Sequence, residues 1–288
     1  MVIGRMELKK DTISKPSIAI TGFPKAGKSA LLAAIQHTDV AEAFDFTELP
    51  GVFMLGRNTP VEEQAYDYLL GRPSSLGMGP PFGIVSVVDA SELSRQLYLA
   101  FQLIDLRLPF VLYLTGVEEA AGKGITVDKN KLAELIGVKV LSAEQDAGAI
   151  ITVLRDWRDS DVEKVVRKPT HWRPSMALAD AYQHLDTEWI HKHLHLYTGA
   201  RLVEGLRLIT VPRAIEDYEA HPAYKSLLRN LDQARKILED RREKWTMAEV
   251  IQRNKWITQT LQAAVSSTVA NNDVPDDQSW WRSLFGKK

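Results

Sequence analysis

The residues Gly22-Phe-Pro-Lys-Ala-Gly-Lys28-Ser29 constrain this chain more than any other segment, because they satisfy the pattern GxxxxGK[ST]. A short apolar run over 17–21 precedes them, and a helical pattern continues from Ala30. In such a strand–loop–helix context the glycines let backbone N–H groups curl around phosphates, and the helix N-terminus adds partial positive charge. The pattern therefore predicts a phosphate-binding loop; a glycine-containing turn without a ligand is the alternative.

The first half of the chain alternates short apolar runs with helical patterns. Apolar runs of this length are typical of strands that are buried on both faces of a parallel sheet. The alternation therefore predicts an α/β fold with a doubly wound, mostly parallel sheet. The predicted strands cover 17–21, 43–47, 84–89, 110–115 and 139–142, and the predicted helices cover 28–37, 60–70, 91–106, 128–136 and 147–157.

The second half has a different pattern, and a length of 288 residues allows about two domains. A polar stretch with Pro169 and Pro174 separates the halves. Beyond it, Leu227, Leu231 and Leu238 form an apolar stripe at helical spacing. We predict a P-loop domain, a linker, an all-α helical domain and a flexible C-terminal tail over residues 1–157, 158–175, 176–270 and 271–288.

Composition excludes several functions. The chain has 36 Lys and Arg against 37 Asp and Glu, so no global basic field suggests a nucleic-acid partner. It has no cysteine, which excludes thiolate metal sites and cysteine nucleophiles. No apolar run approaches the ~20 residues of a membrane-spanning helix. We expect a cytoplasmic protein; the aromatic and basic end around Trp280 and Trp281 suits either the inner membrane face or a packing tail.

The loop residues have predictable roles in phosphate binding. Lys28 should reach the β- and γ-phosphates, and the Ser29 hydroxyl should ligate Mg²⁺. The remaining members of the predicted phosphate-binding set are Gly22, Lys25, Ala26, Gly27 and Ala30.

Three downstream segments carry a resemblance. They read ELPGVFMLGRNTPVEEQAYDYLL over 48–70, VVDASELSRQLYLAFQLIDLRLPFVLYLTGVEEAAGKGI over 87–125, and IGVKVLSAE over 136–144. In order and spacing they resemble the G domain of the ferrous-iron transporter FeoB family, and the helical half resembles the domain that follows it more weakly. The resemblance implies a P-loop GTPase-like fold, GTP or GDP with Mg²⁺ as ligands, and a membrane transport protein as partner.

The fourth loop position departs from that family. The family carries Asn there, where it helps to hold K⁺, and this chain has Lys25. In one interpretation the Lys25 ammonium lies near the potassium position and offsets charge that develops on the phosphate. In the other, Lys25 is an exposed lysine that only neutralises phosphate. The resemblance assigns the chemistry to Lys25, Lys28 and Gly51, whose N–H senses the γ-phosphate in this class.

The segment after the loop is short. Only 19 positions separate Ser29 from Glu48, and the family uses roughly twice that for switch I and its edge strands. Neither Thr38 nor Thr47 has the surroundings of the switch I threonine that ligates Mg²⁺. We therefore expect a sheet without the usual edge hairpin, and slow or absent hydrolysis. Glu48 replaces the usual Asp beside Mg²⁺ with a side chain one methylene longer.

The base-specificity motif NxxD becomes Thr115-Gly-Val-Glu118. Glu118 retains a carboxylate for the guanine edge, but Thr115 lacks the amide that braces the loop, so we expect that brace to be lost. Each lost bond costs about 1–3 kcal/mol. Ser142 and Ala143 retain the SA element that meets the base in this family.

Three functions remain open at this point. The leading one is a FeoB-like, GTP- or GDP-binding regulatory switch with weak or no hydrolysis, which serves a membrane ferrous-iron transport system. The second is a pseudo-GTPase that acts as a scaffold or interaction subunit. The third is a metal-binding protein that uses His191, His193 and His195, which share a face in a strand, while the outer two pair in a helix.

Overall fold

The computed structural model describes residues 15–77, 79–144, 148–159 and 172–267. Most of the predicted linker and the whole predicted tail, with Trp280 and Trp281, lie outside these residues. None of the described helices combines the length and the hydropathy needed to span a membrane.

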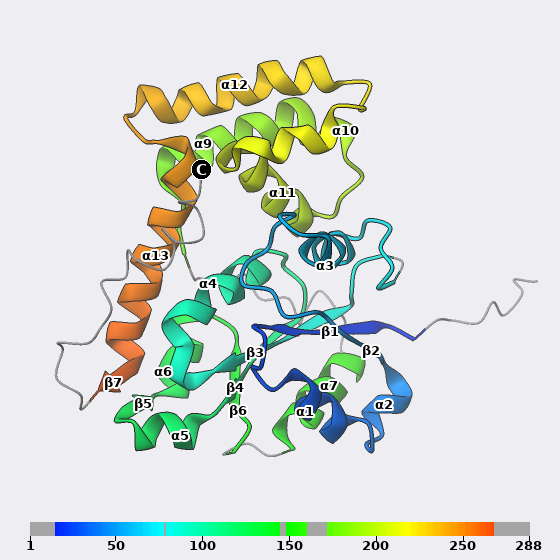
Figure 1. The fold of residues 1–288 in the computed structure, drawn as a ribbon, viewed down its shortest axis with the longest axis vertical. Coiled ribbons are helices and arrows are strands. Elements are labelled where there is room, and N and C mark those ends of the chain that lie inside the picture. Colours follow the sequence, from blue (N-terminus) through cyan, green and yellow to red (C-terminus); the bar gives the residue numbers. More distant parts are fainter. Residues whose placement is uncertain (1–14, 78, 145–147, 160–171, 268–288) are drawn as a thin grey trace, which may run out of the picture.

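The described residues form strands and helices in alternation, followed by helices (Figure 1). The strands are β1 (Ser17–Gly22), β2 (Asp45–Glu48), β3 (Gly83–Asp89), β4 (Phe110–Thr115), β5 (Ile125–Val127), β6 (Lys139–Ser142) and β7 (Val265–Ser267). The helices of the first half are α1 (Lys28–Ile35), α2 (Val40–Ala43), α3 (Pro60–Leu70), the 3₁₀ turn η1 (Ala90–Glu92), α4 (Leu93–Ile104), α5 (Val117–Gly122), α6 (Lys129–Ile136) and α7 (Ala149–Asp159). Those of the second half are α9 (Met176–Leu185), the π-helical turn η2 (Asp186–Ile190), α10 (His191–His193), α11 (Thr198–Thr210), the 3₁₀ helix η3 (Pro212–Tyr218), α12 (Tyr224–Asp240) and α13 (Trp245–Ala264).

The central sheet has five strands in the order β2-β1-β3-β4-β6, and all its pairs are parallel. Helices α1 and α7 lie on one face, and α3 and α4 lie on the other (Figure 1). Strands β1, β3 and β4 are buried almost throughout, as continuous apolar runs between two helical layers require. The doubly wound, mostly parallel α/β fold is therefore confirmed.

The edge of the sheet differs from a simple strand prediction. Ala43 was expected to begin a strand, but it closes the short helix α2, which buries Val40, and β2 starts only at Asp45. Strand β2 pairs with β1 alone among the described strands and ends at Glu48. The predicted absence of an edge hairpin is confirmed for this part of the chain.

The helical region has a second apolar core. Trp189, Leu206 and Leu231 belong to this core, which α9, α11 and α12 enclose. Helix α13 reaches both cores, because Ala248 lies in the helical core while Ile257 lies in the core of the sheet. Figure 1 shows α13 running from the helical region down beside α4 and α6, and β7 then pairs antiparallel with β5. The domain limits at residues 157, 175 and 270 remain predictions.

Candidate functional site

The phosphate loop joins the end of β1 to the start of α1. Gly22 has φ 148°, and a Cβ there would lie 2.2 Å from the carbonyl oxygen of Val87 on β3. Gly27 precedes the first turn of α1 in a left-handed conformation with φ 97°. Glycine is therefore required at both ends of the loop, at the first by close approach and at the second by backbone conformation.

Lys28 closes over the loop that precedes it. Its Nζ donates to the carbonyl oxygens of Phe23, at 3.0 Å, and Gly22, at 3.3 Å. Burial lowers the pKa of Lys28, and the nearby Glu48 carboxylate opposes this shift. Lys28 is only 7% exposed, so an anionic ligand in the loop would interact strongly with its ammonium group.

Ser29 and Glu48 lie side by side. The Ser29 hydroxyl donates to Oε1 of Glu48 at 2.8 Å, so the longer glutamate side chain reaches the loop directly. A hydroxyl and a carboxylate are oxygen ligands of the type that Mg²⁺ prefers. The donor set at the start of α1 therefore fits Mg²⁺.

The segment after Glu48 is held against the loop. The Leu49 N–H donates to the Ile20 carbonyl at 2.8 Å, and a Cβ at Gly51 would lie 2.6 Å from the backbone nitrogen of Pro24. Phe53 packs edge-on against Phe23, with 5.0 Å between ring centroids. Gly51 thus lies directly against the backbone of the loop.

Thr115 corrects one prediction. We expected the brace between the base-specificity motif and the phosphate loop to be lost, but Oγ1 of Thr115 donates to the Ala26 carbonyl at 2.9 Å. Parallel pairing places Thr115 opposite Asp89 at the ends of β4 and β3, beside the loop. The expectation was wrong because the end of β4 lies close to the backbone of the phosphate loop. The short threonine side chain can therefore reach the Ala26 carbonyl.

The base side of the site contains a residue that the sequence analysis did not assign. Glu144 accepts the Gly116 N–H at 2.8 Å and the Ser142 hydroxyl at 3.1 Å. The Ala143 N–H donates to the Leu114 carbonyl at 2.8 Å, so a base would compete for it. The sequence feature that could have indicated this role is the position of Glu144, an acidic residue directly after Ser142 and Ala143. Glu118 is exposed in the first turn of α5.

The other predicted residues have these positions. Lys25 is exposed in a left-handed conformation with φ 65°, and no ion pair of Lys25 occurs among the described residues. Ala26 is buried and Ala30 is exposed on α1. The Thr38 hydroxyl donates to the Ile35 carbonyl at the end of α1, away from Ser29.

Thr47 is the other threonine of the short segment. It lies on β2 near the hydroxyls of Ser17 and Tyr68. Neither threonine reaches Ser29, as expected from their surroundings in the sequence.

The histidines do not form the predicted pairs. Helix α10 ends at His193, and the backbone is extended from Leu194, so no single strand or helix contains all three. His191 bonds Arg201 through Nδ1 at 2.8 Å, while His193 stacks on Trp189. No group of three or more His, Asp or Glu able to hold a metal occurs in the described part of the chain.

Comparison with known proteins gives one consistent family. The family model described as "Ferrous iron transport protein B" matches residues 35–156, a range that begins after the phosphate loop. The Fe(2+) transporter FeoB of Legionella pneumophila (strain Paris) is 30% identical over 169 residues, which cover 57% of this chain and 22% of the transporter. FeoB of Staphylococcus aureus (strain COL) is 35% identical over 85 residues, 30% of this chain and 12% of the transporter.

Solved structures support the fold. NFeoB from S. thermophilus bound to GDP·AlF4⁻ and K⁺ superposes with a TM-score of 0.69 at 21% identity, over 86% of this chain and 99% of that one. The cytosolic domain of L. pneumophila FeoB gives a TM-score of 0.65 at 21% identity, over 87% of this chain and 100% of that one. The chain thus resembles the cytoplasmic G domain of FeoB, and its match spans 22% of the length of the Legionella transporter and 12% of that of the Staphylococcus transporter.

Proposed function

We propose that this chain is a FeoB-like regulatory module that binds GTP and GDP with Mg²⁺ and hydrolyses GTP slowly or not at all. The observation that carries the proposal is the arrangement of the phosphate-loop residues in the structure. Lys28 caps the loop from inside, and the Ser29 hydroxyl is paired with the Glu48 carboxylate. Backbone N–H groups at the start of α1 add the partial positive charge that phosphates require.

Each residue has a part in this proposal. Lys28 contacts the β- and γ-phosphates, Ser29 and Glu48 hold the metal, and the Gly51 N–H senses the γ-phosphate. When bound, Mg²⁺ neutralises charge on the phosphate oxygens. Lys25 retains both interpretations, as a cation near the potassium position or as an exposed lysine. A comparison of hydrolysis in Na⁺ and K⁺ separates them, since strong stimulation by K⁺ contradicts the first.

Guanine recognition is assigned to the loops after β4 and β6. The hydrogen bond from Thr115 to Ala26 supports this assignment, because it holds the motif that carries Glu118 against the phosphate loop. Glu118 would accept the guanine N–H groups, and Ser142 and Ala143 would flank the base. The neighbouring NFeoB structure holds a guanine nucleotide in the same fold, which favours guanine over adenine here.

The proposed partner is a membrane metal-ion transport protein. The matching relatives are Fe(2+) transporters, and this chain corresponds to a small part of each. Nucleotide state would then change the contact between the helical region and the transporter, at the inner face of the membrane.

A pseudo-GTPase that acts as an interaction subunit is the second candidate, and the base side of the site favours it. Glu144 already bonds Gly116 and Ser142, and the Ala143 N–H is bonded to Leu114. A nucleotide base must displace these contacts in order to bind, which lowers the affinity of the site for nucleotide.

Nucleotide binding tests the proposal. Fluorescent GTP, GDP and ATP are titrated with and without Mg²⁺ into the natural chain, Lys28→Ala and Lys236→Ala, an exposed control on α12. We expect micromolar guanine-nucleotide binding that Lys28→Ala weakens by at least about tenfold, roughly 1.4 kcal/mol, while Lys236→Ala binds normally. Absence of binding to any nucleotide by the folded natural chain supports the pseudo-GTPase, and a preference for ATP rejects guanine recognition.

A further inference from the structure

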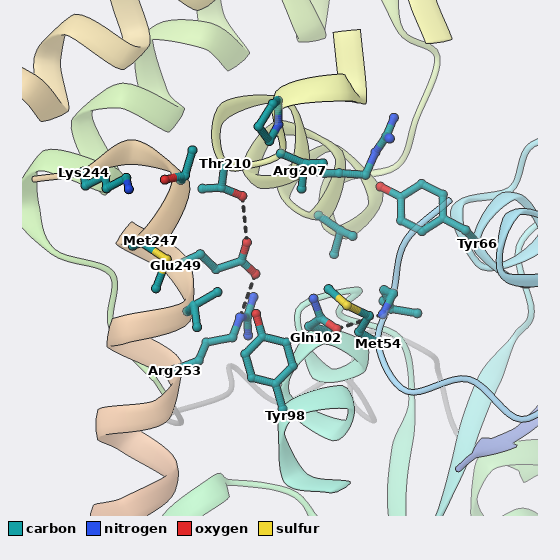
Figure 2. A pocket seen from close by; sticks show the side chains of 16 residues that line it. Met54, Tyr66, Tyr98, Gln102, Arg207, Thr210, Lys244, Met247, Glu249 and Arg253 are labelled. Carbon is teal, nitrogen blue, oxygen red and sulfur yellow. Dashed lines mark hydrogen bonds and ion pairs between the residues drawn. The ribbon is translucent and has the colours of Figure 1, made fainter. Parts of the chain in front are cut away.

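A cavity of about 360 Å³ lies between the helical region and the segment that follows Gly51 (Figure 2). Its walls are mainly apolar, and they come from α11, α13, α4 and that segment. Residues that line it include Met54, Leu55, Val203, Met247 and Val250. This is the size and character of a site for a small organic molecule, and it is distinct from the phosphate loop.

Two polar side chains bring N–H groups to this cavity. Arg253 is 1% exposed, and its Nε and Nη2 pair with Glu249 and Asp105, but its buried Nη1 has no hydrogen-bond partner within the described part of the chain. Gln102 accepts the Leu55 N–H through Oε1 at 2.8 Å, and no bond of its amide nitrogen occurs among the described residues. Figure 2 shows both side chains reaching toward the cavity from α13 and α4.

The Arg253 nitrogen calls for an acceptor, since a buried donor without a partner is costly. The acceptor should be uncharged, because Arg253 already faces the carboxylates of Asp105 and Glu249. A third carboxylate beside them would be repelled, whereas a carbonyl oxygen would accept without adding charge. The Thr210 hydroxyl donates mainly to the Leu206 carbonyl at 2.8 Å and lies 3.3 Å from Oε2 of Glu249, so this carboxylate retains lone pairs for one more donor.

We infer that this cavity binds a small, neutral amphiphile, in which a carbonyl group meets Arg253 and Gln102 and an apolar body fills the space between Met54 and Val250. An amide fits best, because its oxygen accepts from the two side chains while its N–H donates to Glu249. The inference is independent of nucleotide binding.

Three probes of similar size test the charge argument: phenylacetamide, phenylacetate and phenethylammonium. Binding to the full chain is followed by ligand-observed NMR and isothermal calorimetry. Fragments of this size bind with dissociation constants of about a millimolar. We expect phenylacetamide to bind at least about tenfold more tightly than either charged probe, as an extra buried charge costs more than that.

Matched variants of one helix test the location. Val250→Phe fills the cavity from α13 and should abolish phenylacetamide binding, whereas Ile251→Phe, on the neighbouring residue that is 54% exposed, should leave it unchanged. Gln102→Met keeps the volume of the side chain but removes its amide, and it should weaken phenylacetamide by about tenfold while ethylbenzene binds as before. It supplies the same test if Val250→Phe fails to fold.

Several outcomes overturn the inference. These are no binding of phenylacetamide to the folded natural chain, equal binding of all three probes, or binding that survives in folded Val250→Phe. The first outcome would mean that water alone fills the cavity and satisfies Arg253.

Discussion

Thr115 illustrates how one side chain joins two motifs that are 89 positions apart. Its hydroxyl donates to the Ala26 carbonyl inside the phosphate loop, while its backbone continues β4 toward Glu118. Gly27 packs against the same side chain, since a Cβ at this position would lie 3.3 Å from the Thr115 methyl group. The loop and the base-specificity motif are thereby held in one arrangement.

Removing the Thr115 hydroxyl should weaken the contact between the base-specificity motif and the phosphate loop. In Thr115→Val, a nearly isosteric change, the Ala26 carbonyl loses its partner at a cost of about 1 kcal/mol. We expect guanine-nucleotide affinity to fall by roughly fivefold, with a similar loss in the free energy of unfolding. Calorimetric titration with GDP and urea unfolding measure the two effects.

Thr115→Ser is the matched control because it keeps the hydroxyl. Its affinity should stay within about twofold of the natural chain. Equal losses in the serine and valine variants would show that the methyl group, and not the hydrogen bond, matters at this position.

The local part of the site was predictable from the sequence, and the rest was not. Gly22, Lys28 and Ser29 lie within one strand–loop–helix unit, so their spacing alone determines their geometry. The contacts of Thr115 and Glu144 depend on how β4 and β6 align beside the loop, and a single sequence does not reveal that alignment.

Among the elements, α3 and α11 are joined by a buried ionic network. Glu204 on α11 is fully buried and accepts from Tyr66 of α3, at 2.6 Å, and from Arg207, at 2.8 Å. Arg207 also pairs with Asp217, which contacts Arg57 in the segment after Gly51. The network therefore connects the segment next to the phosphate loop with the helical region.

Glu204 should make stability depend on pH. Burial raises its pKa, but Arg207 and Arg72 more than offset this and lower it from 4.5 to about 2. The folded pKa lies below the unfolded value, so the contribution is fully present above about pH 4.5 and is lost as the pH falls toward 2. We expect Glu204→Gln to destabilise the fold by about 3 kcal/mol at pH 7, because Arg207 and Arg72 each lose one of their two carboxylate partners.

Urea unfolding at pH 7 and pH 3 measures this effect. The loss of stability between these pH values should be smaller in Glu204→Gln than in the natural chain. The exposed Glu216→Gln is the control and should change stability by no more than about 0.5 kcal/mol. An unchanged pH dependence in Glu204→Gln would contradict the assignment.

The elements themselves were largely predictable, since five strands and five helices of the first half lie within a few residues of their expected limits. Buried apolar runs and amphipathic periods carry that signal. Helix α5 and strand β5 were missed because both are short, and β5 pairs with β7, which lies far along the chain.

At the scale of the whole molecule, the described residues form two apolar cores that share one helix. Ile257 of α13 is 2% exposed in the core of the sheet, and Ala248 of the same helix lies in the helical core. Because α13 cannot leave one core without disturbing the other, we expect the described parts to unfold in one transition.

Ile257→Ala tests this coupling. The truncation should cost about 2–5 kcal/mol through lost burial and a residual cavity. Tryptophan fluorescence and far-UV circular dichroism should shift together to a lower denaturant midpoint. Ile251→Ala, on the exposed side of α13, should leave the midpoint almost unchanged. Two separate transitions in the natural chain would show that the cores are independent.

The pairing of β7 with β5 determines where a mechanical load enters the molecule. Ser267 lies opposite Ile125 and Val265 lies opposite Val127, so tension applied to the chain at Ser267 acts first on the Ile125 pair. An antiparallel ladder loaded at one end opens pair by pair, which takes little force. Strand β5 follows α5, which carries Glu118, and Ile125, Val127 and Val265 pack against the core of the sheet, so a pull at this point acts on the proposed base-binding loop and on that core together.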